Sequence, residues 1–467
     1  MIGVTTFNAT AGASSPVLDA PRTLLFGCLL VVMFFWAFEL AIAEAAHGVI
    51  EPVLGDWYAV SLHGTALVVI SVLFVSGGAW RASELRADPH LLLLVIALFL
   101  TVGFLALPTS SAEPVEIRFA YQQLICGYLA PVLTLAALLT LPAALQTRVW
   151  HWFYAGWVAF LLVSLILLRV SWQSAGQFSH GWSEIPFLQK LFLWRYNMGE
   201  PWNIYGLVMG NANKMSNYLI MFLLFSVRLL SRPGRRMTLL LGAFWVLGLV
   251  TLLILFSRAA LLLLVPVILL SGIGKRMATF AVVGLVIVAA GTLVAVYLIE
   301  PRVFEYLFLA QVSEKDEANP AGTFVDRLEM WTTLLNYFSA NPPAALHGMG
   351  TTGYGLRFYN SYQAGTHNLF LDLWAESGIV APLLFIACIG LTILLIVTAK
   401  KVVSERMVLA AGVVILVLLM TREHSMSYLY VTSLGGLCFM VIPYLAVRQH
   451  EALASTDASV TVHEDGA

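Results

Sequence analysis

Long apolar runs recur along this chain and constrain its fold more than any other feature. The stretches 89–107 and 378–398, for example, contain no Asp, Glu, Lys or Arg. A run of about 20 apolar residues is long enough to cross a bilayer as a helix. Since 60% of the 467 residues are hydrophobic and only 11% are charged, a soluble domain is excluded. A β-barrel is excluded as well, because its strands would alternate apolar and polar residues, whereas these runs are continuous. The sequence predicts an all-α, polytopic transmembrane helical bundle.

The apolar pattern predicts about twelve spans. They lie near 23–43, 60–78, 89–107, 120–144, 149–169, 204–227, 237–256, 259–273, 277–299, 378–398, 406–421 and 425–446. The chain then divides into an N-terminal segment (1–22), nine spans (23–299), a large loop (300–366), a returning helix with the last three spans (367–446) and a tail (447–467). The tail is rich in Ser, Thr, Asp and Glu, so we expect it to be disordered.

Basic residues alternate between the two sides of this predicted bundle. If the N-terminus is cytoplasmic, the inner connections hold Arg81, Arg86, Arg148, Arg228, Arg232, Arg235, Arg236, Lys275, Arg276, Lys400, Lys401 and Arg406. The short outer connections 44–59 and 108–119 hold one basic residue, Arg118. The positive-inside rule therefore predicts that both termini are cytoplasmic and that the 300–366 loop faces the exterior or periplasm.

Two further segments and the four cysteines also fit a membrane protein. The first apolar run is long for a signal sequence, so an uncleaved first span is favoured over a cleaved leader. The outer loop 170–203 is dense in Trp, Phe and Tyr, and we expect it to lie at the headgroup level. Cys28, Cys126, Cys388 and Cys438 fall in apolar spans without metal-ligand spacing and are interpreted as small core residues.

The long hydrophilic interruption, Glu300 to Thr366, carries the chemistry. It ends at Thr366-His367-Asn368, where the chain returns to the membrane. Thr366 is a candidate N-cap, which predicts His367 in the first helical turn. There the helix dipole disfavours an imidazolium, as a general base requires. Asn368, Asp372 and Glu376 follow at four-residue spacing and predict one polar stripe. A solvated surface helix is the alternative.

Two arginines extend this candidate site. Arg258 lies in a tight outer turn just before a predicted helix, where a guanidinium and backbone N–H groups favour an anion. Arg327 lies on a predicted helix, about 324–338, four residues before Trp331. Together the arginines predict a phosphate or diphosphate clamp. The alternatives are that Arg258 reaches the headgroups and that Arg327 pairs with Asp326 or Glu329.

Two weaker polar segments lie at predicted span ends. Asn211, Asn213 and Lys214 open the sixth span and either line a substrate path or satisfy the backbone of a broken helix. Arg422 lies in a short outer turn, in a supporting or a purely structural role. Neither segment decides the chemistry.

Other chemistries lack their key residues. No Walker loop, GxSxG or HExxH motif is present. The net charge of −1 and the absence of a basic tract give no indication of a nucleic-acid partner. The acidic residues of the first outer loop show no DxD or ExD pairing. We therefore predict neither a metal nor a cofactor.

The order of the polar elements resembles that of the O-antigen ligase and O-antigen polymerase superfamily. The resemblance covers about 205–395 and rests on Gly210 to Asn213, Ser257-Arg258, Asp326-Arg327 with Trp331, Gly348 with Gly350, and His367-Asn368 with Glu376 and Gly378. His347 stands where the family usually carries a hydrophobic residue, so a second histidine is available to titrate.

This resemblance implies a GT-C-like, metal-independent transferase of the bacterial inner membrane. Its donor would be a glycan on a polyprenyl-diphosphate carrier, and its acceptor a glycan chain, a lipid A-core sugar or a protein hydroxyl. Arg258 and Arg327 would bind the leaving diphosphate, and His367 would deprotonate the acceptor hydroxyl. The donor motifs leave ligase, polymerase and protein transfer open.

Two other classes of protein remain as alternatives. A polysaccharide transporter or flippase also has about twelve spans, but it usually shows inverted repeats and charges near the midplane. A non-enzymatic subunit of a polysaccharide export system is the second.

Overall fold

The described part of the chain is helical and contains no strand. The computed structural model describes residues 20–38, 62–76, 87–105, 129–178, 212–230, 235–255, 263–265, 267–268, 294, 324–350, 353–359, 365–398, 409–410, 412–415, 417 and 437–447. Within these residues the predicted all-α class is confirmed.

Most described helices coincide with predicted spans. They are α1 (Ala20–Phe35), η1 (Trp36–Phe38), α3 (Leu62–Ser76), α4 (Ala87–Leu105), α6 (Ala130–Thr140), α7 (Ala143–Phe178), α10 (Ala212–Leu229), α11 (Arg235–Leu255), α20 (Val380–Thr398) and the π-helical η8 (Leu437–Val441). Among the described residues, Ala144–Ile166 and Val380–Thr398 are long and apolar enough to cross a membrane. The apolar stretches found in the other described helices have 10–17 residues, so the count of twelve spans stays a prediction.

The boundary between the predicted fourth and fifth spans was wrong. The sequence placed it at 145–148, whereas α6 ends at Thr140 and α7 begins at Ala143. Leu141 is extended, with ψ 146°, because a residue before a proline avoids the helical region. Arg148 therefore lies inside α7. This helix also continues to Phe178, into the stretch that was predicted as an outer loop.

Side chains fix the break at Pro142. The Gln146 side-chain nitrogen donates to the carbonyl oxygen of Leu141 at 2.7 Å, and the Tyr444 hydroxyl donates to Gln146 Oε1 at 2.9 Å. Gln146 is buried. A buried amide needs such partners, so this network ties the break to the C-terminal helical segment.

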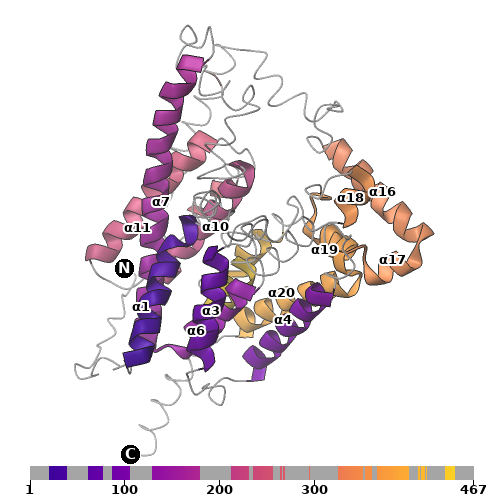
Figure 1. The fold of residues 1–467 in the computed structure, drawn as a ribbon, viewed down its shortest axis with the longest axis horizontal. Coiled ribbons are helices and arrows are strands. Elements are labelled where there is room, and N and C mark those ends of the chain that lie inside the picture. Colours follow the sequence, from indigo (N-terminus) through magenta and orange to yellow (C-terminus); the bar gives the residue numbers. More distant parts are fainter. Residues whose placement is uncertain are drawn as a thin grey trace, which may run out of the picture.

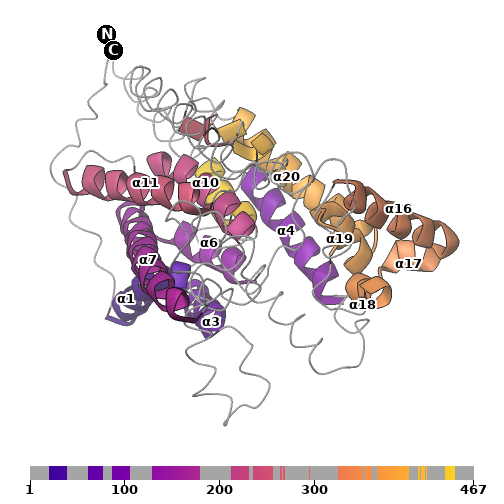
Figure 2. The ribbon, with the colours of Figure 1, turned by 90° about the horizontal axis from the view of Figure 1, so that it is seen from above.

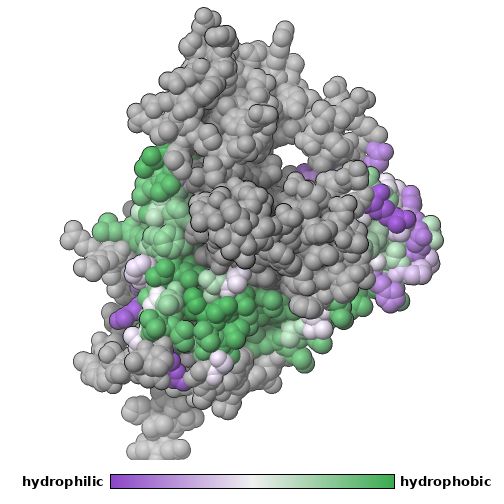
Figure 3. All heavy atoms as spheres, viewed as in Figure 1, coloured by the Kyte–Doolittle hydropathy of each residue, from purple (hydrophilic) through white to green (hydrophobic). Residues whose placement is uncertain are grey.

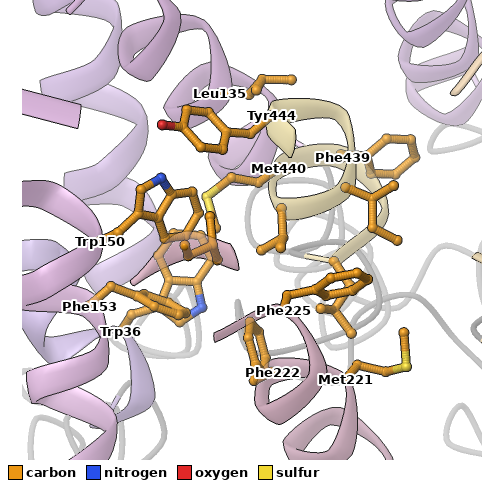
Figure 4. Packing of buried hydrophobic residues seen from close by; sticks show 14 of the residues in the cluster. Trp36, Leu135, Trp150, Phe153, Met221, Phe222, Phe225, Phe439, Met440 and Tyr444 are labelled. Carbon is orange, nitrogen blue, oxygen red and sulfur yellow. The ribbon is translucent and has the colours of Figure 1, made fainter. Parts of the chain in front are cut away.

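Aromatic rings fill the core between the membrane helices. Phe153 of α7 contacts Trp36, Trp150 and Phe222, with ring centroids 5.8, 5.5 and 5.5 Å away. Figure 4 shows these rings converging from different elements, with Tyr444 beside Trp150. Offset and edge-to-face pairs of this kind add to the free energy gained by burial. The three free cysteines in the described residues are buried or half-buried, as predicted for core residues; Cys126 lies outside the described residues.

One glycine sets the distance between α1 and α7. A Cβ atom at Gly156 would overlap the carbonyl oxygen of Phe34. Only glycine allows this approach of two backbones, which is a common device in membrane helix packing.

A second group of helices has its own core. It comprises α16 (Phe324–Ala340), α17 (Pro342–His347), α18 (Gly353–Tyr359) and α19 (Leu369–Ser377), called the outer unit below. Its buried residues are Met330, Leu334, Phe338, Tyr354 and Ala375. In Figures 1 and 2 the outer unit lies to one side of the other helices, and α19 leads into α20, which runs beside α4.

The two groups differ at the surface. Figure 3 shows hydrophilic residues along the edge formed by the outer unit and apolar residues over the membrane helices. Along α20, Leu383, Ile386, Leu394 and Val397 are at least half exposed. Because such a row of apolar side chains is expensive in water, α20 is suited to face lipid.

Candidate active site

Helix α16 carries Arg327 and Trp331 in the outer unit. The sequence predicted a helix over about 324–338, and α16 runs Phe324–Ala340, so this prediction is confirmed. Residues four apart lie on one face of a helix, and Met330, Leu334 and Phe338 bury the neighbouring face in the outer core. The packing of α16 therefore fixes the side on which Arg327 and Trp331 lie.

The N-cap of α19 is Asn368, and the prediction of Thr366 was wrong. Asn368 Oδ1 accepts from the backbone N–H groups of Phe370 and Leu371 at 3.1 and 3.4 Å. Asparagine is the stronger N-cap of the two residues. The Thr366 hydroxyl instead bonds Asn368 itself, donating to its carbonyl oxygen at 2.9 Å and accepting from its N–H at 3.2 Å.

His367 consequently lies just before the N-cap and outside the first helical turn. Its φ is +56°, the one positive φ of a residue other than glycine in the described residues. This left-handed region costs an L-residue about 1–2 kcal/mol. A conformation of this kind persists only where the surroundings fix it, and such residues cluster at functional sites. The prediction that the helix dipole keeps the His367 imidazole neutral assumed a position in the first turn, and His367 does not have that position.

Thr366 connects α16 and α19 to the segment that precedes α19. Its backbone N–H donates to Asp372 Oδ1 at 2.7 Å, and its carbonyl oxygen accepts from Trp331 Nε1 at 2.8 Å. Thr366 is fully buried. The contact with Trp331 brings α16 against the residue that precedes His367. Sequence reasoning named Thr366 only as a cap and missed this role, since nothing local predicts a bond across 35 positions.

Two members of the predicted polar stripe bond the chain itself. Asp372 is buried, and its carboxylate accepts from Thr366. The Asn368 side chain caps α19. Glu376 is half-buried one turn further along. The substrate-binding roles of all three stay predictions.

The segment 345–350 docks on the end of α19. The N–H groups of Met349 and Gly350 donate to the carbonyl oxygens of Ala375 and Glu376 at 2.7 and 3.1 Å. The carbonyl oxygen of Ala345 accepts from Trp374 Nε1 at 2.7 Å and from the Ile379 N–H at 3.2 Å. These bonds satisfy carbonyls that a helix end leaves open. They join α17 to the α19–α20 junction, while His347, at the end of α17, is exposed.

Gly348 and Gly378 make this docking possible. Both have positive φ, +81° and +77°, and a Cβ atom at either would overlap backbone atoms of the other segment. Gly378 ends α19 as its C-cap, a common use of glycine. The site is therefore built on a junction where two backbones touch.

Several predicted site residues lie outside this geometry. Arg258, Asn211 and Arg422 fall outside the described residues. Asn213 and Lys214 lie in the first turn of α10, and their side chains are likewise outside the description. The structure thus brings together the elements of Arg327, Trp331, His367, Asn368 and Asp372.

Within the described residues, no group of three or more His, Cys, Asp or Glu side chains is arranged to hold a metal ion. At the start of α19, the side chains of Thr366, Asn368 and Asp372 bond backbone groups. This region offers a histidine on a restrained backbone and, on the helix packed against it, an arginine.

Apolar helices of this kind, with a polar junction at the start of one of them, define a helical membrane protein. Residues 243–386 match a protein family described as O-antigen ligase. The match includes Arg258, Arg327 and His367, and it confirms the predicted resemblance to the O-antigen ligase superfamily. No curated protein matches the chain.

Proposed function

We propose that this protein transfers a glycan from a polyprenyl-diphosphate carrier to an acceptor hydroxyl at the outer face of a bacterial inner membrane. The observation that carries the proposal is the bond from Trp331 to Thr366. Arg327 precedes Trp331 by one helical turn, a rise of about 6 Å, and His367 follows Thr366 directly. A cation and an imidazole from distant parts of the sequence thus share one small region.

In the proposed reaction His367 accepts the proton of the acceptor hydroxyl. The hydroxyl oxygen attacks the anomeric carbon of the donor sugar and forms the new glycosidic bond. The bond from that carbon to the diphosphate oxygen breaks, and the diphosphate leaves with the electron pair. Negative charge grows on the leaving group, so the guanidinium groups of Arg327 and Arg258 would stabilise the transition state.

The acceptor is a growing glycan, a lipid A-core sugar or a protein hydroxyl, and the site residues serve the donor in each case. We further propose a multi-pass arrangement with both termini in the cytoplasm and residues 300–366 in the periplasm. The charge distribution along the sequence supports this orientation.

The test uses the full chain in lipid nanodiscs with a polyprenyl-diphosphate-linked glycan. Release of polyprenyl diphosphate and the mass of the glycan product are followed for the wild type, His367→Asn and Arg327→Gln. Asparagine tolerates the left-handed backbone, so His367→Asn removes the imidazole with little strain. We expect each variant to lose about 100-fold or more in rate.

The control for Arg327 is Arg357→Gln. Arg357 is exposed on α18 and stacks over the ring of Tyr337, 4.3 Å from its centroid, so this change should leave the rate near that of the wild type. Release that survives both site substitutions contradicts the roles of His367 and Arg327, whereas absence of release from the wild type with every acceptor contradicts the transferase and favours a transporter. The product mass distinguishes polymerase from ligase.

A further inference from the structure

We propose that Trp331, Thr366 and Asp372 are positioning residues that set the direction in which the His367 side chain leaves the backbone. The inference rests on the proposed function, because it assigns His367 to the reaction. It assigns Trp331 and Asp372 a positioning role in place of the contact with substrate that was predicted from the sequence.

The direction of the Cα–Cβ bond, along which a side chain leaves the backbone, is fixed once the peptide groups on either side of its Cα are fixed, because φ and ψ are the only soft backbone angles. The peptide group before His367 is held through its oxygen, which accepts from Trp331 Nε1 at 2.8 Å. The peptide group after His367 is held through its N–H, which belongs to Asn368 and donates to Thr366 Oγ1 at 3.2 Å. Both φ and ψ of His367 are thereby constrained.

Asp372 fixes the residue that provides one of these restraints. Its carboxylate accepts from the Thr366 N–H at 2.7 Å, and its own N–H donates to the Asn368 carbonyl oxygen at 2.9 Å. A charge-assisted hydrogen bond is about twice as strong as a neutral one. Asp372 and Thr366 are both buried, so water does not readily replace these bonds.

The restraints oppose a known preference of the chain. Without them, an L-residue leaves the left-handed region for the α or β region, and the Cβ of His367 would then point in another direction. Several hydrogen bonds that converge on one strained residue are more than the cap of α19 requires, since Asn368 already provides that cap. Catalysis by proximity and orientation requires that the imidazole is held in the right geometry relative to the substrate.

The first experiment compares Trp331→Phe with Trp374→Phe. Both tryptophans are half-buried, lie in the outer unit and donate Nε1–H to a backbone carbonyl, at 2.8 and 2.7 Å. Only the Trp331 bond holds a peptide group of His367. In the nanodisc assay we expect Trp331→Phe to lower kcat at least tenfold with the donor KM unchanged. Trp374→Phe should lose similar thermal stability and keep kcat.

A second pair of variants tests the restraint on the other side of His367. Thr366→Val preserves the volume and removes the hydroxyl, whereas Thr366→Ser preserves the hydroxyl. We expect kcat to fall at least tenfold in Thr366→Val and to recover in Thr366→Ser. At Asp372, Asn retains an oxygen acceptor and Leu does not, so Asp372→Asn should be far more active than Asp372→Leu.

The outcomes separate this inference from the proposed function. If His367→Asn retains activity, the proposed function fails and the inference fails with it. If His367→Asn is inactive but Trp331→Phe and Trp374→Phe have the same kcat, the function stands and the positioning role is wrong. A raised donor KM with unchanged kcat in Trp331→Phe also overturns it and returns Trp331 to substrate binding.

Discussion

The membrane helices and the outer unit are held together by different interactions. Between α1, α7 and α10 the contacts are mainly rings against rings and helix against helix. In the outer unit, by contrast, Trp331, Trp374 and Asp372 bond backbone groups of distant segments. Packing of apolar volume fixes the distance between elements, whereas directional bonds fix the conformation of single residues. A site that needs one imidazole in one direction is better served by the second kind.

This comparison predicts that the outer unit can be broken without unfolding the membrane helices. The largest effect is expected for Gly378→Ala, because the new Cβ would overlap the Leu346 carbonyl and the residue has φ +77°. We expect a loss of about 4 kcal/mol from the outer unit. Limited proteolysis should show early cleavage within 340–366 and loss of transferase activity, while thermal unfolding of the membrane helices changes little. Unfolding of both regions together would contradict the comparison.

The corresponding change in the membrane region is Gly156→Ala. Its Cβ would overlap the Phe34 carbonyl oxygen and push α1 from α7. We expect a loss of about 3 kcal/mol, seen as a lower Tm of the whole protein in detergent. Gly27→Ala on α1 is the control: nothing lies within 4 Å of its Cβ, and alanine should stabilise this helix. Equal Tm values for the two variants would refute the close approach.

A smaller effect is expected at the cap of α19. Asn368→Ala removes the oxygen that bonds the N–H groups of Phe370 and Leu371 and should cost about 1 kcal/mol. Asn368→Ser should recover most of this loss. Hydrogen exchange of the first α19 amides measures the difference. If Thr366 were the cap, as the sequence suggested, Asn368→Ala would leave this exchange unchanged.

The smallest effect concerns the strain at His367. His367→Gly and His367→Ala both remove the imidazole, but glycine has no penalty at φ +56°. We therefore expect the Gly variant to be more stable than the Ala variant by about 1 kcal/mol, with both inactive. Chemical denaturation monitored by Trp fluorescence provides the comparison. Equal stabilities would mean that the backbone at this position is not left-handed in solution.

Much of the fold was predictable because it depends on local pattern. The apolar runs placed α3, α4, α11 and α20 within a few residues, and the 324–338 pattern placed α16. The break at Pro142 was misplaced because apolar residues continue on both sides of it and the charged residue Arg148 lies a few positions further on. The helices α17 and α18 were not predicted. Six or seven residues provide little helical periodicity.

The site was predictable as a set of residue types and not as a geometry. His367 and Arg327 stood out because ionisable groups are costly beside a membrane, and Trp331 stood out because it follows Arg327 by four residues. The prediction of Thr366 as N-cap failed, since Asn368 is also a good cap and the bonds that hold Thr366 come from other elements. No role was predicted for Trp374, although its indole N–H joins α19 to α17.

The sequence by itself therefore determined that this protein is helical, that it belongs in a bilayer and that its candidate site residues gather where the chain returns to the membrane. These properties follow from hydrophobicity and helical period, which act over neighbouring residues. The tertiary structure alone decided that Trp331 meets Thr366, that Gly348 meets Gly378 and that His367 is left-handed. Such contacts join residues tens of positions apart. They form only when packing of the whole outer unit offsets the entropy of closing the loop.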